Sequence, residues 1–428
     1  MNNLNNIYER LLNYADNMKI IDTHEYLNLT KNYVGDEPDV LCDYLSHDIS
    51  TGLLSAGLNR EDFAKIRDYK VDIINRFKIL EPYLECVKNT LYYRSLELSA
   101  KKIHGINEIS IKTIEELNSK FKKTASRADY GNYIMKDLCN IESVINNWLS
   151  DDMNQVMTDL LVYSWNPKSF TFPDIKAIRE NGLDFEKLSL DEYCEEYKQH
   201  FLTLLNKGVK TIKISMAYEH SLYIEDIDYN SAKKLYSDFV KKYKELKKGE
   251  VENFQLKFDK KLQDYMLHFV LKIANENNFI VQIETGIQDE TSNSFKNIDS
   301  MITTNLFEDY SNLTFDIFYT GYHYGRRLIN FAKTYANVYI GLCWANIISL
   351  QTSANAFYEM LNTPRTKVFG FGGGCGFYDG VAGHLILAKQ KFCKELSQKV
   401  CNGECDIDTA ENFLQSVLYD NAKRTFKL

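Results

Sequence analysis

Near the C-terminus, a cysteine stands among glycines directly after an apolar run. Residues 367–371 read KVFGF, and residues 372–376 read GGGCG. Glycines let the backbone approach a ligand closely, and their amides can bind an oxyanion. Because a thiolate is a strong nucleophile at neutral pH, we interpret the run as a buried strand that delivers Cys375 to a site, with Gly373 and Gly374 binding substrate. A tight turn into the next helix is the alternative.

Four other apolar runs carry ionisable or hydroxyl-bearing side chains at or near their ends. They contribute His24 (run 20–26), Lys213 (211–215), Glu284 (279–286) and Tyr319 (315–321). Polar side chains at the ends of successive parallel strands are how a barrel builds an active site. Burial and mutual charge in such a site shift pKa values toward those that general acids and bases need.

The chemistry of these residues can be divided in two ways. The first and last strands of a closed barrel are neighbours, so we predict that His24 is the base for a Cys375 nucleophile. If Cys375 is not the nucleophile, the chemistry passes instead to Glu284 and Tyr319 as an acid–base pair, with Lys213 lowering the pKa of Tyr319. The alternatives are an inert buried cysteine and a packing histidine. Lys213 and Glu284 could equally form a structural ion pair, since a buried carboxylate needs a partner.

A second group of residues is predicted to bind the substrate. Tyr26, Arg94, His220 and Trp344 belong to it. Arg94 and His220 could hold an anionic group, although such side chains are more often solvated charges. Trp344 could stack on a ligand, and packing at the top of the barrel is the alternative. His384, near the start of a helix, is more typical of a structural residue.

Long helical patterns dominate the first third of the chain. Residues 2–18 show apolar side chains at helical spacing, and so do residues 60–80 and 82–103. Residues 36–140 contain no convincing strand. We therefore predict a helical insertion at about residues 30–140, placed over the site.

After residue 140, short apolar runs alternate with helical segments, which is typical of βα units. Candidate strands end near His24, Asn146, Tyr163, Ser215, Glu284, Tyr319, Cys343 and Phe371. Eight strands with helical connections predict an α/β fold, a (β/α)8 TIM-type barrel. We expect one domain over residues 1–428, with C-terminal helices from about residue 383 onward.

The composition excludes several classes of protein. Hydrophobic residues are 44% and aromatic residues 13% of the chain, which favours a globular fold over disorder. The net charge of −8 argues against a nucleic-acid partner. No apolar run approaches the roughly 18 residues that span a bilayer, and the N-terminus is too polar for a signal peptide. We expect a cytoplasmic protein that takes a small-molecule substrate. The sequence is also compatible with a homo-oligomer.

The nine cysteines of the chain are scattered and lack the paired spacing of metal or disulfide frameworks. We therefore expect reduced thiols. The composition gives no indication of a bound cofactor, and we predict none.

The order of these segments resembles the amidohydrolase superfamily, and most closely its branch related to uronate isomerase. The resemblance covers nearly the whole chain. It rests on segments 21–25 (IDTHE), 46–57, 213–218, 281–283, 337–340, 343–344, 371–373 and 383–384. The shared order implies the same barrel fold.

Members of that superfamily hold one or two divalent metals, and the resemblance implies where their ligands would fall. A His-x-His pair lies on strand one, histidines follow strands five and six, and an aspartate follows strand eight. In this sequence His24 matches the first ligand, whereas Tyr26, Glu284, Tyr319 and Gly374 stand at the other four positions. A hydrolytic metal site needs about three protein ligands. The resemblance therefore implies a barrel whose metal site is degenerate, and we predict no metal.

Two functions are compatible with such a barrel. The first is a metal-independent enzyme that acts on a small polar molecule by acyl transfer, hydrolysis or isomerisation. The second is a catalytically inactive binding or scaffold protein that kept the pocket. Ionisable replacements at 284 and 319 favour the enzyme, because a decaying site would tolerate small inert residues there.

Overall fold

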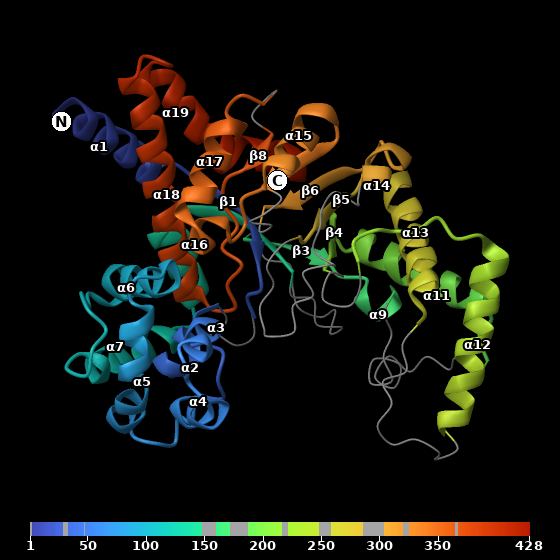
Figure 1. Ribbon diagram of the computed structural model, residues 1–428, viewed down its shortest axis with the longest axis horizontal. Coiled ribbons are helices and arrows are strands. Elements are labelled where there is room, and N and C mark those ends of the chain that lie inside the picture. Colours follow the sequence, from blue (N-terminus) through green and yellow to red (C-terminus); the bar gives the residue numbers. More distant parts are fainter. Residues whose placement is uncertain are drawn as a thin grey trace.

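The computed structural model is a barrel of eight parallel strands (Figure 1). It describes residues 2–28, 33–46, 48–147, 160–171, 187–215, 221–247, 258–285, 304–319, 325–363 and 367–428. The strands are β1 (Ile20–Glu25), β2 (Ile141–Asn146), β3 (Leu161–Trp165), β4 (Thr211–Ile214), β5 (Ile280–Ile283), β6 (Thr314–Phe318), β7 (Val338–Gly341) and β8 (Val368–Phe369). They are hydrogen-bonded in sequence order, each parallel to the next.

The two edges of this sheet meet where β1 runs beside the segment that follows β8. Thr23 N donates to Phe371 O at 3.1 Å, and Gly374 N donates to His24 O at 2.8 Å. The predicted (β/α)8 barrel is therefore confirmed. Each strand ends within two residues of its predicted end, because a buried parallel strand shows up in the sequence as a short apolar run.

Helices fill the chain between β1 and β2, where the sequence predicts an insertion. They are α2 (Val40–Tyr44), α3 (Asp48–Ser55), α4 (Arg60–Ile66), α5 (Ile73–Val87), α6 (Leu91–His104), α7 (Ile114–Ala125), α8 (Tyr130–Asn132) and the π-helix η1 (Tyr133–Leu138). They gather on one side of the barrel beside α18, and α11 to α13 lie on the opposite side (Figure 1).

The remaining helices connect the strands and form the C-terminal tail. They are α1 (Asn2–Asn17), α9 (Lys168–Thr171), α11 (Leu190–Asn206), α12 (Tyr229–Lys247), α13 (Lys260–Glu276), α14 (Thr304–Asp309), α15 (Gly325–Thr334), α16 (Ala345–Ile348), α17 (Leu350–Met360), α18 (Tyr378–Cys401), α19 (Ile407–Gln415), the π-helix η4 (Ser416–Asp420) and α20 (Asn421–Phe426). None of the helices in the described residues combines the length and the apolar character that crossing a membrane requires.

Two helix boundaries in the insertion differ from the prediction. The expected helix over residues 60–80 is broken between α4 and α5, and Pro82 lies inside α5 rather than at the start of a helix. Side-chain caps set the true starts: Asp72 accepts from Asn75 N before α5, and Thr90 accepts from Tyr93 N before α6. Such caps satisfy amides that a helix start leaves without partners.

The C-terminal helix closes the lower end of the barrel. Ala422 and Phe426 of α20 pack with Ile21, Ile280 and Phe369, which point into the barrel from its strands. A π-helical turn leaves a carbonyl without its usual partner, and in η4 Val417 O accepts from Gly370 N at 2.7 Å, just after β8. The barrel therefore has a sealed lower end, and its chemistry must lie at the upper, C-terminal ends of the strands.

A buried hydrogen-bond network joins the insertion to α18. Asp379 accepts from Tyr44 Oη at 3.0 Å, contacts His104 Nε2 at 2.7 Å and accepts from Tyr130 Oη. Backbones also approach closely here, since a Cβ on Gly383 would lie 2.1 Å from a carbonyl oxygen of α6. The insertion is thus held in place at the barrel rather than attached only through its ends.

Inside the insertion, a buried ion pair fixes α2 against α5. Arg76 donates to both oxygens of Asp39, at 2.9 and 2.7 Å, and the two side chains are 2% and 1% exposed. Asp39 also caps α2 by accepting from Leu41 N and Cys42 N. Burial raises the pKa of Asp39, but the hydrogen bonds and charge of Arg76 outweigh that effect and lower it overall.

Removing the guanidinium should therefore destabilise the fold. We expect Arg76→Met to lower the free energy of unfolding by about 3 kcal/mol, because it leaves the Asp39 carboxylate buried without its partner. Urea denaturation measures the change. The control is Arg127→Met, which breaks an exposed ion pair with Asp129 and should cost below about 1 kcal/mol. Equal losses in the two variants would contradict the role of burial.

Candidate active site

A lysine and a glutamate form an ion pair at the upper ends of β4 and β5. Lys213 Nζ lies 3.4 Å from Glu284 Oε2, and the side chains are 1% and 3% exposed. The register of β4 and β5 explains why these two side chains lie together. Lys213 pairs with Gln282, and Glu284 is two residues farther along, so its side chain points to the same face.

Neither end of this ion pair is satisfied by hydrogen bonds. Within the described residues, Lys213 Nζ and Glu284 Oε2 have no hydrogen-bond partner. Lys213 Nζ instead lies 3.7 Å from the centre of the Phe318 ring and 5.9 Å from that of Trp344. Burial lowers the pKa of Lys213, although the charge of Glu284 opposes the shift. A buried charge pair with unused hydrogen-bonding capacity is costly, and a bound ligand is one way to use that capacity.

Below the pair lies a layer of polar side chains inside the barrel. Gln282 Nε2 donates to Asp316 Oδ2 at 2.9 Å and to Thr23 O at 2.8 Å. Burial raises the pKa of Asp316 to about 7, despite the hydrogen bond from Gln282 and the charge of Lys213. Gly341 leaves room for this carboxyl, since a Cβ there would lie 2.6 Å from Asp316 Oδ1. The floor of the site is therefore polar and close to neutral in charge.

His24 is fixed by aromatic rings. Its ring centre lies 4.8 Å from Tyr26, 4.7 Å from Phe318 and 4.8 Å from Trp344. Its Nδ1 contacts the side-chain amide of Asn147. With the amide nitrogen donating, Nδ1 accepts, and the neutral imidazole carries its proton on Nε2. This orientation fixes His24 close to Phe318, over which the Lys213 ammonium also lies.

The imidazole beside Cys375 is that of His384 on α18. Cys375 Sγ lies 3.2 Å from His384 Nδ1, and that nitrogen also lies 2.8 Å from Gly373 O. A carbonyl oxygen only accepts, so Nδ1 must carry the proton and cannot take one from the thiol in this tautomer. The sequence analysis pairs Cys375 with His24, and that pairing stays a prediction; Nδ1 of His24 contacts the side-chain amide of Asn147.

The glycine turn is shaped by packing. A Cβ on Gly373 would lie 2.1 Å from Glu25 Oε1, and one on Gly374, whose φ is 65°, would lie 2.0 Å from Trp344 Nε1. Its amides are also used inside the protein: Gly374 N donates to His24 O, and Cys375 N donates to Glu25 Oε2 at 2.5 Å. The amides of Gly374 and Cys375 are therefore bonded to β1 in this conformation, and the expected binding of an oxyanion by the other glycine amides stays a prediction.

Two buried acids on β1 were missed by the sequence analysis. Burial raises the pKa of Asp22 to about 6, and burial together with the nearby charge of Asp22 raises the pKa of Glu25 well above its ordinary value. They lie inside the segment IDTHE, where only His24 was singled out. The available signal was three ionisable side chains within four residues of a buried strand, which cannot all be charged.

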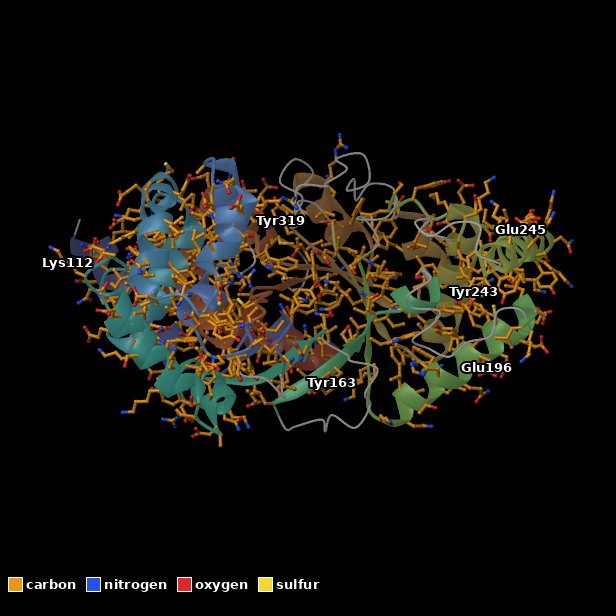
Figure 2. All side chains as sticks on the ribbon, turned by 90° about the horizontal axis from the view of Figure 1, so that it is seen from below. Lys112, Tyr163, Glu196, Tyr243, Glu245 and Tyr319 are labelled. Atoms are coloured by element: carbon orange, nitrogen blue, oxygen red, sulfur yellow. The ribbon has the colours of Figure 1, made fainter. Side chains whose placement is uncertain are left out.

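The other predicted residues lie in different places. Tyr319 follows β6 directly, is 5% exposed, and lies near the middle of the molecule in Figure 2. Tyr26 and Trp344 stack with ring centres 6.1 Å apart, and Trp344 Nε1 donates to Gly374 O at 3.1 Å, so Trp344 packs the barrel top. Arg94 lies on α6 and pairs with Glu97 at 3.1 Å, with its side chain 55% exposed. His220 lies outside the described residues.

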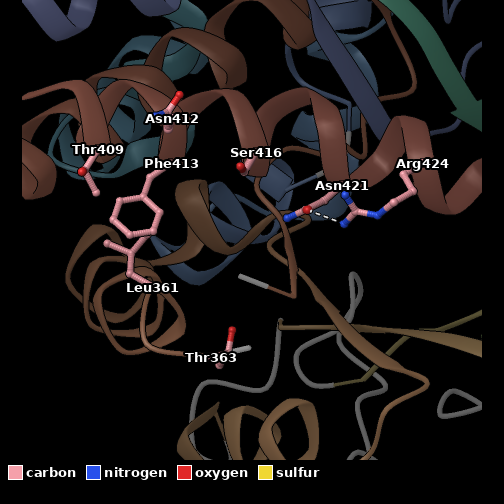
Figure 3. A pocket seen from close by; sticks show the side chains of 8 residues that line it. All are labelled: Leu361, Thr363, Thr409, Asn412, Phe413, Ser416, Asn421 and Arg424. Atoms are coloured by element: carbon pink, nitrogen blue, oxygen red, sulfur yellow. Dashed lines mark hydrogen bonds between the residues drawn. The ribbon is translucent and has the colours of Figure 1, made fainter. Parts of the chain in front are cut away.

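A cavity lies beside the C-terminal helices. Its volume is about 680 Å³. It is lined by Leu361, Thr363, Thr409, Asn412, Phe413, Ser416, Asn421 and Arg424 (Figure 3). Because η4 and α20 form part of its wall and also seal the lower end of the barrel, this cavity is separate from the strand-end site.

The fold is shared with solved structures of sugar-acid enzymes. A uronate isomerase from Thermotoga maritima matches with a TM-score of 0.76 and 14% identity, covering 98% of this chain and 97% of that one. A glucuronate isomerase from Caulobacter crescentus matches with 0.75 and 14%, covering 99% and 94%. A Lactobacillus casei protein described as a metal-dependent hydrolase matches with 0.67 and 13%, covering 97% of each chain. No family model and no curated protein matches the sequence.

The described residues at this site do not form a set of ligands for a divalent metal, which the description of the Lactobacillus casei protein implies for that protein. Among the described residues, no group of three or more histidine, cysteine, aspartate or glutamate side chains converges as metal ligands. Glu284 faces the Lys213 ammonium, and His24 is enclosed by aromatic rings. The Lys213 ammonium, 3.4 Å from Glu284 Oε2, occupies the position beside the carboxylate that a bound metal ion would take.

The raised pKa of Asp316 predicts a pH dependence of stability. Its folded-state pKa of about 7 lies above the ordinary value of about 3.9, so the folded protein holds this proton longer than the unfolded chain does. The stabilisation is complete below about pH 4 and is lost as the pH rises through about 7. Asp316→Asn, which stays neutral, should reduce the fall in melting temperature between pH 5 and 8.

Other acids titrate in the same range, so the fall should shrink without vanishing. Asp408→Asn changes a side chain that is 82% exposed and serves as the control. An unchanged pH profile in Asp316→Asn would show that this carboxyl titrates normally.

Proposed function

We propose that this protein is an enzyme that moves protons on a small polar carbonyl compound, with isomerisation of a sugar acid such as a uronate as the reaction. The observation that carries the proposal is the buried pair of Lys213 and Glu284 at the strand ends. The likeness of the fold to uronate isomerases supports the choice of substrate class. The chemistry itself is argued from the side chains.

Glu284 is suited to be the base. Removing a proton from the carbon next to a carbonyl group requires a base near that carbon, and a positive charge near the oxygen stabilises the anion that forms. Lys213 supplies that charge 3.4 Å from the carboxylate, and burial under aromatic rings strengthens its effect. In this proposal Tyr319, one residue after β6, gives or takes a proton at a substrate hydroxyl.

The proposal is tested by deuterium exchange. Incubating the protein with D-glucuronate and a panel of other uronates in D₂O should replace the hydrogen on the carbon next to the carbonyl, which proton NMR detects as a lost signal. Glu284→Gln should slow the exchange by about 100-fold or more, because it removes the base. Lys213→Met should slow it to a similar extent, because it removes the charge at the oxygen.

Lys367→Met provides a matched control. Lys367 is also buried, but it lies before β8 and donates to Ala332 O at 2.8 Å and Tyr335 O at 2.6 Å. This variant should lose stability while keeping its exchange rate. Binding of a uronate without exchange would instead favour the catalytically inactive binding protein.

A thiol enzyme is the second candidate, because Cys375 Sγ lies 3.2 Å from the His384 imidazole. The Nδ1 proton can stabilise a thiolate there, and acyl transfer or hydrolysis would follow from attack by the sulfur. This alternative predicts that Cys375→Ser abolishes turnover while the circular dichroism spectrum stays unchanged. The acid–base proposal predicts that turnover remains.

Independence from metal is part of the proposal. Treatment with a strong chelator followed by gel filtration should leave the exchange rate unchanged, since Glu284 and Lys213 supply the required charges. Elemental analysis before and after treatment provides the check. One zinc or manganese per chain whose removal stops exchange would show that ligands beyond His24 and Glu284 complete a metal site.

A further inference from the structure

Lys213 differs from a buried lysine that only supports the fold. The ammonium of Lys367 donates hydrogen bonds to two backbone carbonyl oxygens, at 2.8 and 2.6 Å. Lys213 Nζ has no hydrogen-bond acceptor in the described residues and faces one carboxylate at 3.4 Å and one aromatic ring at 3.7 Å. The charge of Glu284 and the Phe318 ring therefore hold this nitrogen at the upper ends of the strands. The N–H groups of the ammonium make no hydrogen bond within the described residues.

We propose that Lys213 is a covalent catalytic residue that forms an imine with an aldehyde or ketone group, and that Glu284 carries the protons of this reaction. The inference rests on the proposed function and deepens it, because it limits substrates to compounds with an open carbonyl group. It also changes the role of Lys213 from a fixed charge to a nucleophile.

The surroundings of Lys213 favour a neutral amine when the substrate binds. An ammonium has no lone pair, so the nitrogen must first lose a proton. Burial lowers the pKa of Lys213, which makes that loss easier than for an exposed lysine. Glu284 Oε2, 3.4 Å away and without another hydrogen bond in the described residues, can accept the proton.

The steps balance with these two side chains alone. The Lys213 proton moves to Glu284, and the amine nitrogen then forms a bond to the carbonyl carbon. Glu284 gives this proton to the oxygen, which becomes a hydroxyl group, and then moves a second proton from the nitrogen to that hydroxyl group, which leaves as water. A carbon–nitrogen double bond remains, with one proton and one positive charge on the nitrogen. The Glu284 carboxylate next removes a proton from the neighbouring carbon, and the electron pair moves toward the nitrogen. Reprotonation of the same carbon, on either face, restores the iminium, and addition of water then releases the sugar acid with that carbon exchanged or inverted and restores the amine.

The iminium cation fits the place of the ammonium that it replaces. It keeps one positive charge beside Glu284 and over the Phe318 ring, where a ring face attracts a cation. Asp316 lies in the layer below, and its charge also acts on Lys213. The site thus needs no rearrangement of charge between its resting state and the intermediate.

Reductive trapping tests the inference. The protein is incubated with D-glucuronate, and separately with glyceraldehyde as a smaller probe, in the presence of sodium cyanoborohydride. The reagent reduces an iminium to a stable secondary amine, which peptide mass spectrometry locates. Lys213 should carry the adduct in at least tenfold excess over Lys210, which is exposed and lies three residues earlier.

A conservative variant separates the covalent role from a role of charge. Lys213→Arg keeps a cation but cannot form an imine, so it should be as inactive in deuterium exchange as Lys213→Met. Exchange in Lys213→Arg within about tenfold of the wild type would overturn the imine and leave the acid–base proposal standing. Should Lys213→Arg fail to fold, trapping in the wild-type protein decides alone.

The remaining outcomes are also decisive. Adducts no more frequent at Lys213 than at Lys210, with either probe, overturn the imine even if exchange is observed. Adducts at Lys213 together with unimpaired exchange in Lys213→Met would show a reactive lysine outside the catalytic path, which also overturns the inference. Absence of exchange with all uronates removes the proposed function, and a Lys213 adduct with glyceraldehyde would then still report an imine-forming site.

Discussion

The site depends on the cost of burying the charge of Lys213. An ammonium removed from water loses several kcal/mol of hydration, and a single carboxylate at 3.4 Å recovers only part of that. The barrel reduces the cost with the Phe318 ring and with polar side chains below, yet it leaves both ends of the ion pair without hydrogen bonds in the described residues. An arrangement that is costly when empty is one that a polar ligand can stabilise.

The rest of the structure holds this pair in place. The lower end of the barrel is closed by α20, whose Ala422 and Phe426 pack against side chains of the strands. The glycine turn after β8 is tied to β1 through backbone hydrogen bonds, which places Trp344 and His24 around the pair as packing side chains. The network at Asp379 fixes the insertion helices to α18, and α18 carries the imidazole that contacts Cys375. Stability and site geometry are therefore coupled through β1 and β8.

The sequence predicted the barrel well, because each buried strand is a short apolar run ending near a polar residue. It also brought Lys213 and Glu284 together, since strands four and five are neighbours in a barrel. It could not show which imidazole lies beside Cys375. His384 reaches back over a turn of nine residues, and that geometry depends on the start of α18 rather than on any local pattern.

The acidic residues inside the barrel were not predicted from the sequence, for a related reason. Asp22, Glu25 and Asp316 lie in buried strands. The sequence of such a strand does not show whether a polar side chain points into the barrel or toward the surrounding helices. β1 also contains register shifts, so alternation fails there. The glycine content predicted free amides in this turn, but the structure uses the amide of Gly374 to join the two edges of the sheet.

A crystal structure of Glu284→Gln soaked with D-glucuronate tests the central claim most directly. The account predicts electron density for the sugar acid at the upper end of the barrel, with its carbonyl carbon or oxygen within about 3.5 Å of Lys213 Nζ, or bonded to that nitrogen. Density that lies instead against Cys375 and His384, or only in the cavity beside the C-terminal helices, would contradict it.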